Sequence, residues 1–188
     1  MACVVKKLKF DIVYDCANFG ALGGTGEIDE AIIINSSDIS AISEENGEGT
    51  ITMLTGKRGY IVSSVNNSVT YQDAIKANDT TPPGEDQSII IKVLAGPHEE
   101  SGGSHTPAGY RNRIAELLGG NFRVALKSKS GNYYLAGAFC GLEASDLATD
   151  SSAGGITTVT LKTPEASTGD RLVTLTKANY EGLKEAKV

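Results

Sequence analysis

The chain has 188 residues, a net charge of −6 and a hydrophobic fraction of 40%, values that suit one domain with a sizeable core. An acidic balance argues against a protein that holds nucleic acid by its phosphates. No stretch approaches the ~18 apolar residues of a membrane helix, and MACVVKKLKF lacks the long apolar segment of a signal peptide. We therefore expect a protein that is made in a cytoplasm and has no membrane partner.

The negative charge is concentrated near the start of the chain. Residues 1–50 hold nine Asp or Glu and three Lys, whereas residues 10–56 hold no Lys or Arg at all. Such a surface repels nucleic acid. The simplest interpretation is a solvated acidic face, and a functional interpretation depends on the rest of the chain.

The first elements are predicted from the spacing of apolar residues. Residues 4–14 alternate, with Leu8 on one side and Lys7 on the other, which predicts a strand with one wet face. A Gly-rich loop follows, FGALGGTGE. The short apolar run 30–35 predicts a second strand, and the polar residues 36–49 predict a connection.

Further strands are predicted in the next segment. Residues 50–54, 58–65 and 68–72 are expected to form a small meander, with Asn66-Asn67 as a turn signal. Tandem prolines place 76–86 in a loop. The most apolar strand, 87–96, is expected to be central in the sheet.

The clearest helix signal follows a second polar loop, 96–107. Thr106 is a suitable N-cap, Pro107 suits the first turn, and Gly119-Gly120 ends the helix. The residues expected to share its apolar face are Tyr110, Ile114, Leu117 and Leu118.

The clearest hairpin is GNFRVALKSKSGNYYLAGAF, residues 120–139, with its turn at 129–132. Residues 140–154 are predicted to be a loop, and 155–163 and 171–176 to be strands. A short amphipathic helix with Tyr180 and Leu183 inward closes the chain. The predicted fold is therefore mainly β: a β-sandwich or small barrel of about eight or nine strands with one flanking α-helix, in a single domain 1–188.

Residues that carry chemistry are few and scattered. Cys3, Cys16 and Cys140 form no C-x-x-C pair, and His98 and His105 fit no zinc signature. GGSHT departs from a nucleophile elbow. GALGGTGE precedes an acidic strand-like segment where a dinucleotide loop would open a helix. The acidic residues do not have EF-hand spacing. We expect no enzyme, no metal and no cofactor.

The order of the elements resembles a known family. The meander GKRGYIVSSVNNSVTY is followed by SIIIKVLAG, the helix YRNRIAELLGG, the hairpin FRVALKSKSGNYYLAG and the Thr-rich strand ITTVTLKTPE. This combination, over roughly residues 5–175, resembles the tail tube (major tail) proteins of long-tailed bacteriophages, especially those of Bacteroidetes hosts.

The resemblance implies a virion structural protein, a tail tube subunit that forms stacked hexameric rings. Its implied partners are other copies of itself, other tail proteins, and DNA that passes down the channel without specific binding. The terminal segments 1–14 and 177–188 are implied assembly arms. Acidic candidates to line the channel or join rings are Glu27, Asp29, Glu30, Glu44, Glu45 and Glu48. Basic candidates for the subunit interface are Arg123, Lys127 and Lys129.

Two alternatives remain open. A related tail ring, terminator or baseplate-hub protein would share the fold and stop at one ring. A carbohydrate-binding or adhesin-like β-sandwich belongs to another class, which exposed aromatic residues would favour; the chain has no Trp.

Overall fold

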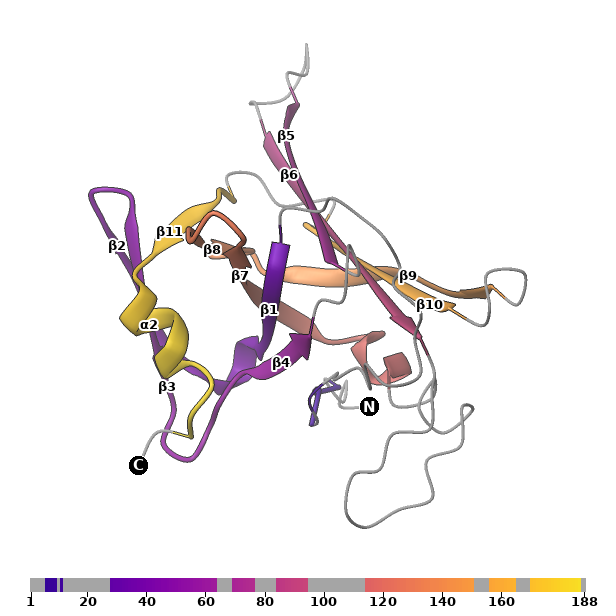
Figure 1. Ribbon diagram of the computed structural model, residues 1–188, viewed down its shortest axis with the longest axis horizontal. Helices are drawn as coiled ribbons and strands as arrows, with labels where there is room; N and C mark the ends of the chain where they lie inside the picture. The colour runs from indigo at the N-terminus through magenta and orange to yellow at the C-terminus, as the bar shows by residue number, and fades with distance from the viewer. Residues whose placement is uncertain are drawn as a thin grey trace, which may run out of the picture.

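The computed structural model describes residues 6–9, 11, 28–63, 69–76, 84–94, 114–150, 156–164 and 170–186. The expectation of a mainly β fold is confirmed (Figure 1). The strands are β1 (Ile28–Asn35), β2 (Ile39–Glu45), β3 (Glu48–Met53), β4 (Tyr60–Ser63), β5 (Val69–Lys76), β6 (Gly84–Leu94), β7 (Asn121–Ser128), β8 (Tyr133–Ala136), β9 (Leu142–Asp150), β10 (Ile156–Lys162) and β11 (Val173–Leu175). The helical elements are the 3-10 turns η2 (Ser36–Asp38) and η3 (Ala115–Leu117) and the α-helix α2 (Lys177–Gly182).

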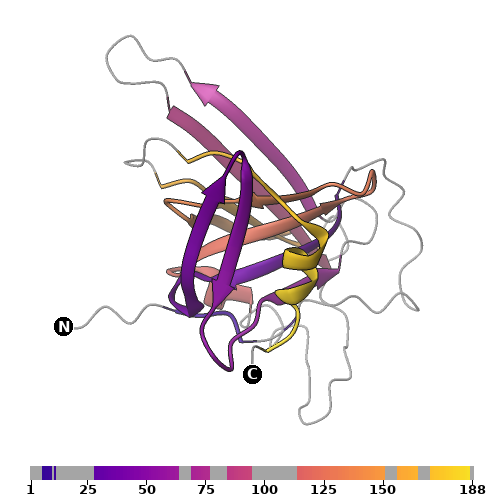
Figure 2. The same cartoon turned by 90° about the vertical axis from the view of Figure 1, so that its left-hand side faces the viewer.

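The eleven described strands join in one sheet with the order β2-β3-β11-β8-β7-β9-β10-β6-β5. Strand β7 also pairs with β1, and β1 pairs with β4. The sheet therefore branches at β7 into two halves, which the two views in Figures 1 and 2 show turning in different directions. It does not close into a barrel, so the small-barrel form of the prediction is wrong.

Two hydrophobic clusters lie on opposite faces of β1 and β7. The first packs Ala31 and Ile33 of β1 against β6 and β10, and the second packs Ile32 and Ile34 against β3, β11 and α2. Because β1 is buried on both faces, it is apolar at successive positions, whereas a half-exposed strand alternates. This explains the uninterrupted run AIIIN, which predicted a strand over 30–35.

The predicted hairpin and C-terminal helix are confirmed. Strands β7 and β8 pair antiparallel around the turn at 129–132, and Phe122, Val124 and Leu126 are fully buried in the first cluster. Helix α2 buries Tyr180, and Leu183 directly after it is buried as well. Neither α2 nor any other helix in the described segments is long and apolar enough to cross a membrane.

Two predicted connections are strands. Residues 36–49 contain β2 and the start of β3, and residues 140–154 contain β9. Each of these strands has a register shift, between Ile39 and Ala41 in β2 and opposite Thr160/Leu161 in β9, which breaks the alternation that marks a strand in sequence.

The predicted meander is also wrong. Strand β3 pairs with β2 and β11, β4 with β1, and β5 with β6. Consecutive strands are neighbours only about two-thirds of the time, and here burial of β1 on both faces draws β4 away from β3. Strand β6, which was expected to be central, lies next to the edge strand β5. The strand in the middle of the order is β7.

The predicted helix over 106–120 falls largely outside the described residues. Ile114 and Leu117 are fully buried, as expected for its apolar face, but Leu118 is 37% exposed. The described part continues as the 3-10 turn η3 and ends at Gly119, whose φ of 92° is left-handed.

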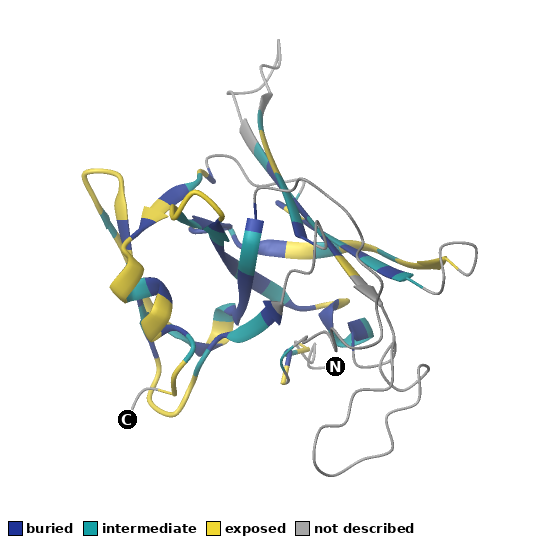
Figure 3. Cartoon of the chain, viewed as in Figure 1, coloured by how far each residue is buried: buried dark blue, intermediate teal, exposed yellow. Residues whose placement is uncertain are grey.

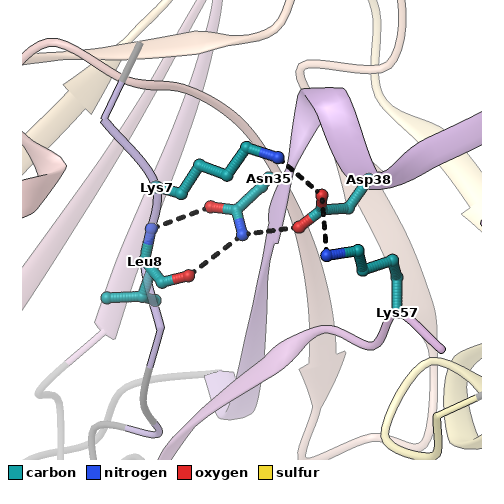
Figure 4. Close-up of polar contacts among 5 residues, drawn as sticks. All are labelled: Lys7, Leu8, Asn35, Asp38 and Lys57. Atoms are coloured by element: carbon teal, nitrogen blue, oxygen red, sulfur yellow. Dashed lines mark hydrogen bonds and ion pairs between the residues drawn. The ribbon is translucent and has the colours of Figure 1, made fainter. Parts of the chain in front are cut away.

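The N-terminal segment is held by side chains. Asn35 binds both backbone groups of Leu8: its Oδ1 accepts from the Leu8 N–H at 2.9 Å, and its Nδ2 donates to the Leu8 carbonyl at 3.0 Å (Figure 4). The same Nδ2 donates to Asp38, which also accepts from Lys7 at 2.9 Å. Residues 6–9 and 11 are therefore not in a strand, although the predicted inward side chain of Leu8 is fully buried. The remainder of the strand predicted over 4–14 lies outside the described residues.

Replacing Asn35 with alanine is expected to lower the free energy of unfolding by about 2–3 kcal/mol, because the two Leu8 backbone groups and Asp38 lose a buried partner. Urea unfolding measures the loss, and Asn132→Ala, at an exposed turn residue, is the control. Equal stability of the two variants would show that the Leu8 contacts contribute nothing.

The Asp38 carboxyl in this cluster gives stability a dependence on pH. Burial raises its pKa, but hydrogen bonds from Lys7 and Asn35 and the charge of Lys57 outweigh that effect, and the pKa lies below its ordinary value. Asp38 therefore stabilises the fold fully above its unfolded pKa of about 3.9, and this stability is lost as pH falls through the lower folded pKa. In the Asp38→Asn variant, this contribution to the free energy of unfolding and its dependence on pH are both lost.

Candidate functional site

The β2–β3 hairpin carries the two described acidic candidates that are exposed, Glu45 and Glu48. Its turn consists of Asn46 (φ 55°) and Gly47 (φ 83°), and two left-handed residues in a two-residue loop form the turn type that matches strand twist. The turn places Glu45 directly opposite Glu48. Figure 3 shows exposed residues gathered on this hairpin, whereas β1 and β7 are buried.

Glu45 and Glu48 are exposed, and neither carboxylate has an ion-pair partner in the described segments. Like charges directly opposite each other destabilise a hairpin. Ser43 and Thr50, the next exposed pair on the same face, add hydroxyl groups. The outward face of the hairpin is therefore polar and negative.

The other acidic candidates have basic partners within the chain. Glu44 accepts from Arg171 at 2.5 Å, Asp29 pairs with Lys127 at 2.7 Å, and Glu30 pairs with Lys184 at 2.6 Å. The sixth candidate, Glu27, lies outside the described residues. The described candidates thus divide into a pair at the start of β1 and a group on the β2–β3 hairpin, and of these only the hairpin group retains unpaired negative charge.

Glu30 also anchors the C-terminal helix. The Tyr180 hydroxyl donates to Glu30 at 3.0 Å, and burial together with the nearby Glu30 charge raises the pKa of Tyr180 well above its ordinary value. Burial lowers the pKa of Lys184, but hydrogen bonds to Glu30 and Glu181 outweigh this effect and raise it. In this structure the described part of the predicted C-terminal arm is packed on its own chain.

The three basic candidates differ in their surroundings. Arg123 is partly buried, donates to Asn121 and to the Phe139 carbonyl, and has a pKa lowered by burial. The hydrogen bond to Asp29 raises the pKa of Lys127. Lys129 is exposed in the β7–β8 turn. Only Lys129 has no ion pair or hydrogen bond within the described part of the chain, and an interface role for all three stays a prediction.

Open sheet edges lie at the two ends of the strand order. Strands β2 and β5 each lack a neighbour on one side among the described strands, and so does β4, which lies off this order and pairs with β1 alone. The ladder of β6 with β10 begins at Ser88, whereas its ladder with β5 continues to Gly84. The β5–β6 ribbon therefore extends beyond the body of the sheet, as Figure 1 shows.

Sequence reasoning missed the turn between β8 and β9. Gly137 (φ 70°) and Gly141 (φ 76°) close it with a hydrogen bond of 3.0 Å. The carboxylate of Asp170, which is fully buried, accepts from the N–H groups of Phe139 at 3.2 Å and Cys140 at 3.1 Å. The two glycines in GAFCG were the available signal, but Asp170 is 30 residues away in sequence.

No arrangement for metal or nucleophilic chemistry is found in the described segments. They hold no group of three His, Cys, Asp or Glu side chains placed to bind a metal ion. Cys140 is a half-buried free thiol. His98, His105, Cys3 and Cys16 lie outside the described residues.

Comparisons with known proteins gave no match to a protein-family model, to a curated protein or to a solved structure.

Proposed function

We propose that this chain is a bacteriophage tail tube subunit, which forms stacked hexameric rings around a channel for DNA. The family resemblance of the sequence supplies this idea. The observation that carries it further is the open sheet, whose two ends, β2 and β5, are free among the described strands.

Free edges at both ends suit a ring. An exposed edge presents unpaired N–H and C=O groups and is an aggregation hazard unless something covers it. When β2 of one copy pairs with the β5–β6 ribbon of the next, these two edges are covered and the sheet continues around the ring. A contact between two different surfaces of this kind generates rings or filaments.

The polar hairpin face suits the channel. Glu45 and Glu48 retain unpaired negative charge, and a negative surface keeps the phosphates of passing DNA from binding. Two carboxylates directly opposite each other destabilise the hairpin. A channel surface that must not bind DNA gives a reason to keep both charges. In this arrangement the β2–β3 face lines the bore.

The proposal is tested by electron microscopy of the purified full-length chain over a wide concentration series. Stacked six-fold tubes support a tail tube subunit. Single rings that never stack support the related ring, terminator or hub role. Monomers at every concentration contradict both.

The edge contact has a matched pair of variants. Ala41 and Ser43 on edge strand β2 lie opposite Thr52 and Thr50 on interior strand β3. Lysines on an edge block further pairing, so Ala41→Lys/Ser43→Lys is expected to raise the concentration needed for assembly by about tenfold or more. Thr50→Lys/Thr52→Lys adds the same charge one strand inward and should change it much less. Light scattering measures assembly, and equal effects would reject the edge contact.

A further inference from the structure

The third open edge of the described sheet, on β4, is occupied by a side chain of the same chain. Strand β4 pairs with β1 alone, so its other side presents backbone groups that no described strand uses. The N–H of Ile61 lies on that side, and it donates to Oδ1 of Asp11 at 2.8 Å. A carboxylate oxygen therefore takes the place that the carbonyl of a neighbouring strand would take.

The Asp11 carboxylate is fixed in this position by a second contact. Arg58, just before β4, binds both of its oxygens: Nη1 lies 3.0 Å from Oδ1, and Nη2 lies 2.9 Å from Oδ2. A two-point pair of this kind sets the orientation of a carboxylate as well as its position. The Asp11 side chain is only 21% exposed. Asp11 thus covers the Ile61 donor in one defined geometry.

The residues before Asp11 are anchored at the end of the sheet. The Asn35 side chain, at the end of β1, binds both backbone groups of Leu8 (Figure 4), and the Leu8 side chain is fully buried. These contacts are made by side chains and by packing in the core, because residues 6–9 and 11 form no strand. Removal of the Asp11 carboxylate therefore uncovers the β4 edge without breaking a strand ladder.

An uncovered β4 edge is suited to a second copy of the same strand. In an antiparallel pair the N–H and C=O of one residue point to the same side, so the Ile61 carbonyl faces outward as its N–H does. Two antiparallel β4 strands with Ile61 opposite Ile61 exchange two hydrogen bonds about a two-fold axis. Residues 60–65 read YIVSSV, an uncharged segment without Pro and rich in β-forming residues. Segments of this composition pair with identical copies of themselves.

We propose that Asp11 is an edge guard, which occupies the Ile61 donor and prevents two copies of the chain from pairing through their β4 strands. Proteins cover or charge their free edges against such pairing, and a carboxylate bound to the edge does both. The guard leaves β2 and β5 as the uncovered edges among the described strands. The proposal does not depend on what these two edges bind, so it is independent of the proposed function.

The test uses variants of the full chain in the Ala41→Lys/Ser43→Lys background, in which lysines block the β2 edge. Asp11→Ala removes the guard. Asp29→Ala is the matched control, because it removes the same charge and an ion pair with Lys127, on the side of β1 that faces β7. Thermal unfolding confirms that each variant is folded.

A second substitution at Ile61 shows whether any new contact uses the β4 edge. Proline is tolerated on an edge strand where its missing N–H would face away from the ladder, and Ile61→Pro removes the donor that a second copy needs. Asp11→Ala/Ile61→Pro should therefore lose the association that Asp11→Ala gains. Ile61→Lys, which blocks an edge by charge, replaces the proline if that variant does not fold.

Sedimentation velocity measures self-association. Asp11→Ala is expected to form dimers and to strengthen self-association by about tenfold or more, whereas Asp29→Ala changes it by less than about threefold. Hydrogen exchange at the Ile61 amide in Asp11→Ala should be faster than in the background chain at low concentration, and should slow as dimers form.

Three results overturn the edge guard and leave the proposed function standing. They are a folded Asp11→Ala chain that associates no more than its background, an equal gain in Asp29→Ala, and dimers that persist with Ile61→Pro or Ile61→Lys. A wild-type chain that is monomeric at every concentration overturns the proposed function and leaves the edge guard standing.

Discussion

Replacing Phe122 with alanine is expected to lower the free energy of unfolding by about 3–5 kcal/mol. Phe122 is fully buried in the first hydrophobic cluster, on the strand where the two halves of the sheet meet. It lies opposite Leu142 of β9 and Asn35 of β1 in the two ladders. Loss of the ring leaves a cavity at the branch point, where a rigid sheet on both sides limits collapse.

The matched control is the same substitution at Phe139, in the turn between β8 and β9. That side chain is 48% exposed, so Phe139→Ala should change the free energy of unfolding by less than about 1 kcal/mol. Guanidinium or urea unfolding of both variants measures the difference. A similar loss at the two positions would mean that the Phe122 site is not a close-packed core.

Together the two variants compare a buried ring with an exposed one. Phe122→Ala removes packing in the core, whereas Phe139→Ala is expected to leave the fold intact. Because the substitution is chemically identical, a difference between its effects at the two positions reports the surroundings of each ring.

The sequence predicts strands reliably where one face is buried and the chain alternates without interruption. Strand β7 shows the period of two clearly, because Phe122, Val124 and Leu126 point into one core, although Ala125 on the other face is buried as well. The β7–β8 turn is also readable, because Gly131 has a φ of 89° that favours glycine.

Strands with a bulge are not readable in this way. In β2 the register passes from Ile39 opposite Met53 to Ala41 opposite Thr52, so Ser40 is an extra residue. In β9 Ser145 is extra in the same sense, between the partners of Thr160 and Leu161. One extra residue moves every later side chain to the other face. The apolar and polar residues then no longer alternate along the segment, so the sequence pattern predicts a loop.

The candidate site depends on contacts between distant residues, which the sequence pattern does not record. Charge counting found the acidic window, but it could not show that Glu30 and Glu44 are neutralised by Lys184 and Arg171. Both partners lie more than a hundred residues away and meet these carboxylates only because β11 and α2 pack on β3 and β1. That Glu45 and Glu48 lack an ion-pair partner among the described residues is seen only in the folded structure.

Replacing Asp170 with alanine is expected to lower the free energy of unfolding by about 3 kcal/mol. Its two oxygens accept from successive backbone N–H groups of the Phe139 turn, and both donors lose their partner. The partly buried guanidinium of Arg123 also loses the opposite charge that favours its protonated form. A buried charge without compensation is among the costlier defects in a fold.

Asp170→Asn tests the same contact with a smaller change. The amide keeps the size of the carboxyl and one accepting oxygen, but its NH2 group opposes the second N–H, so a smaller loss of stability is expected than for alanine. The turn should then hold Phe139 less rigidly, and hydrogen exchange at the Phe139 and Cys140 amides should quicken. Exchange at these two amides that is as slow as in the wild type would show that the Asp170 carboxylate does not hold the turn.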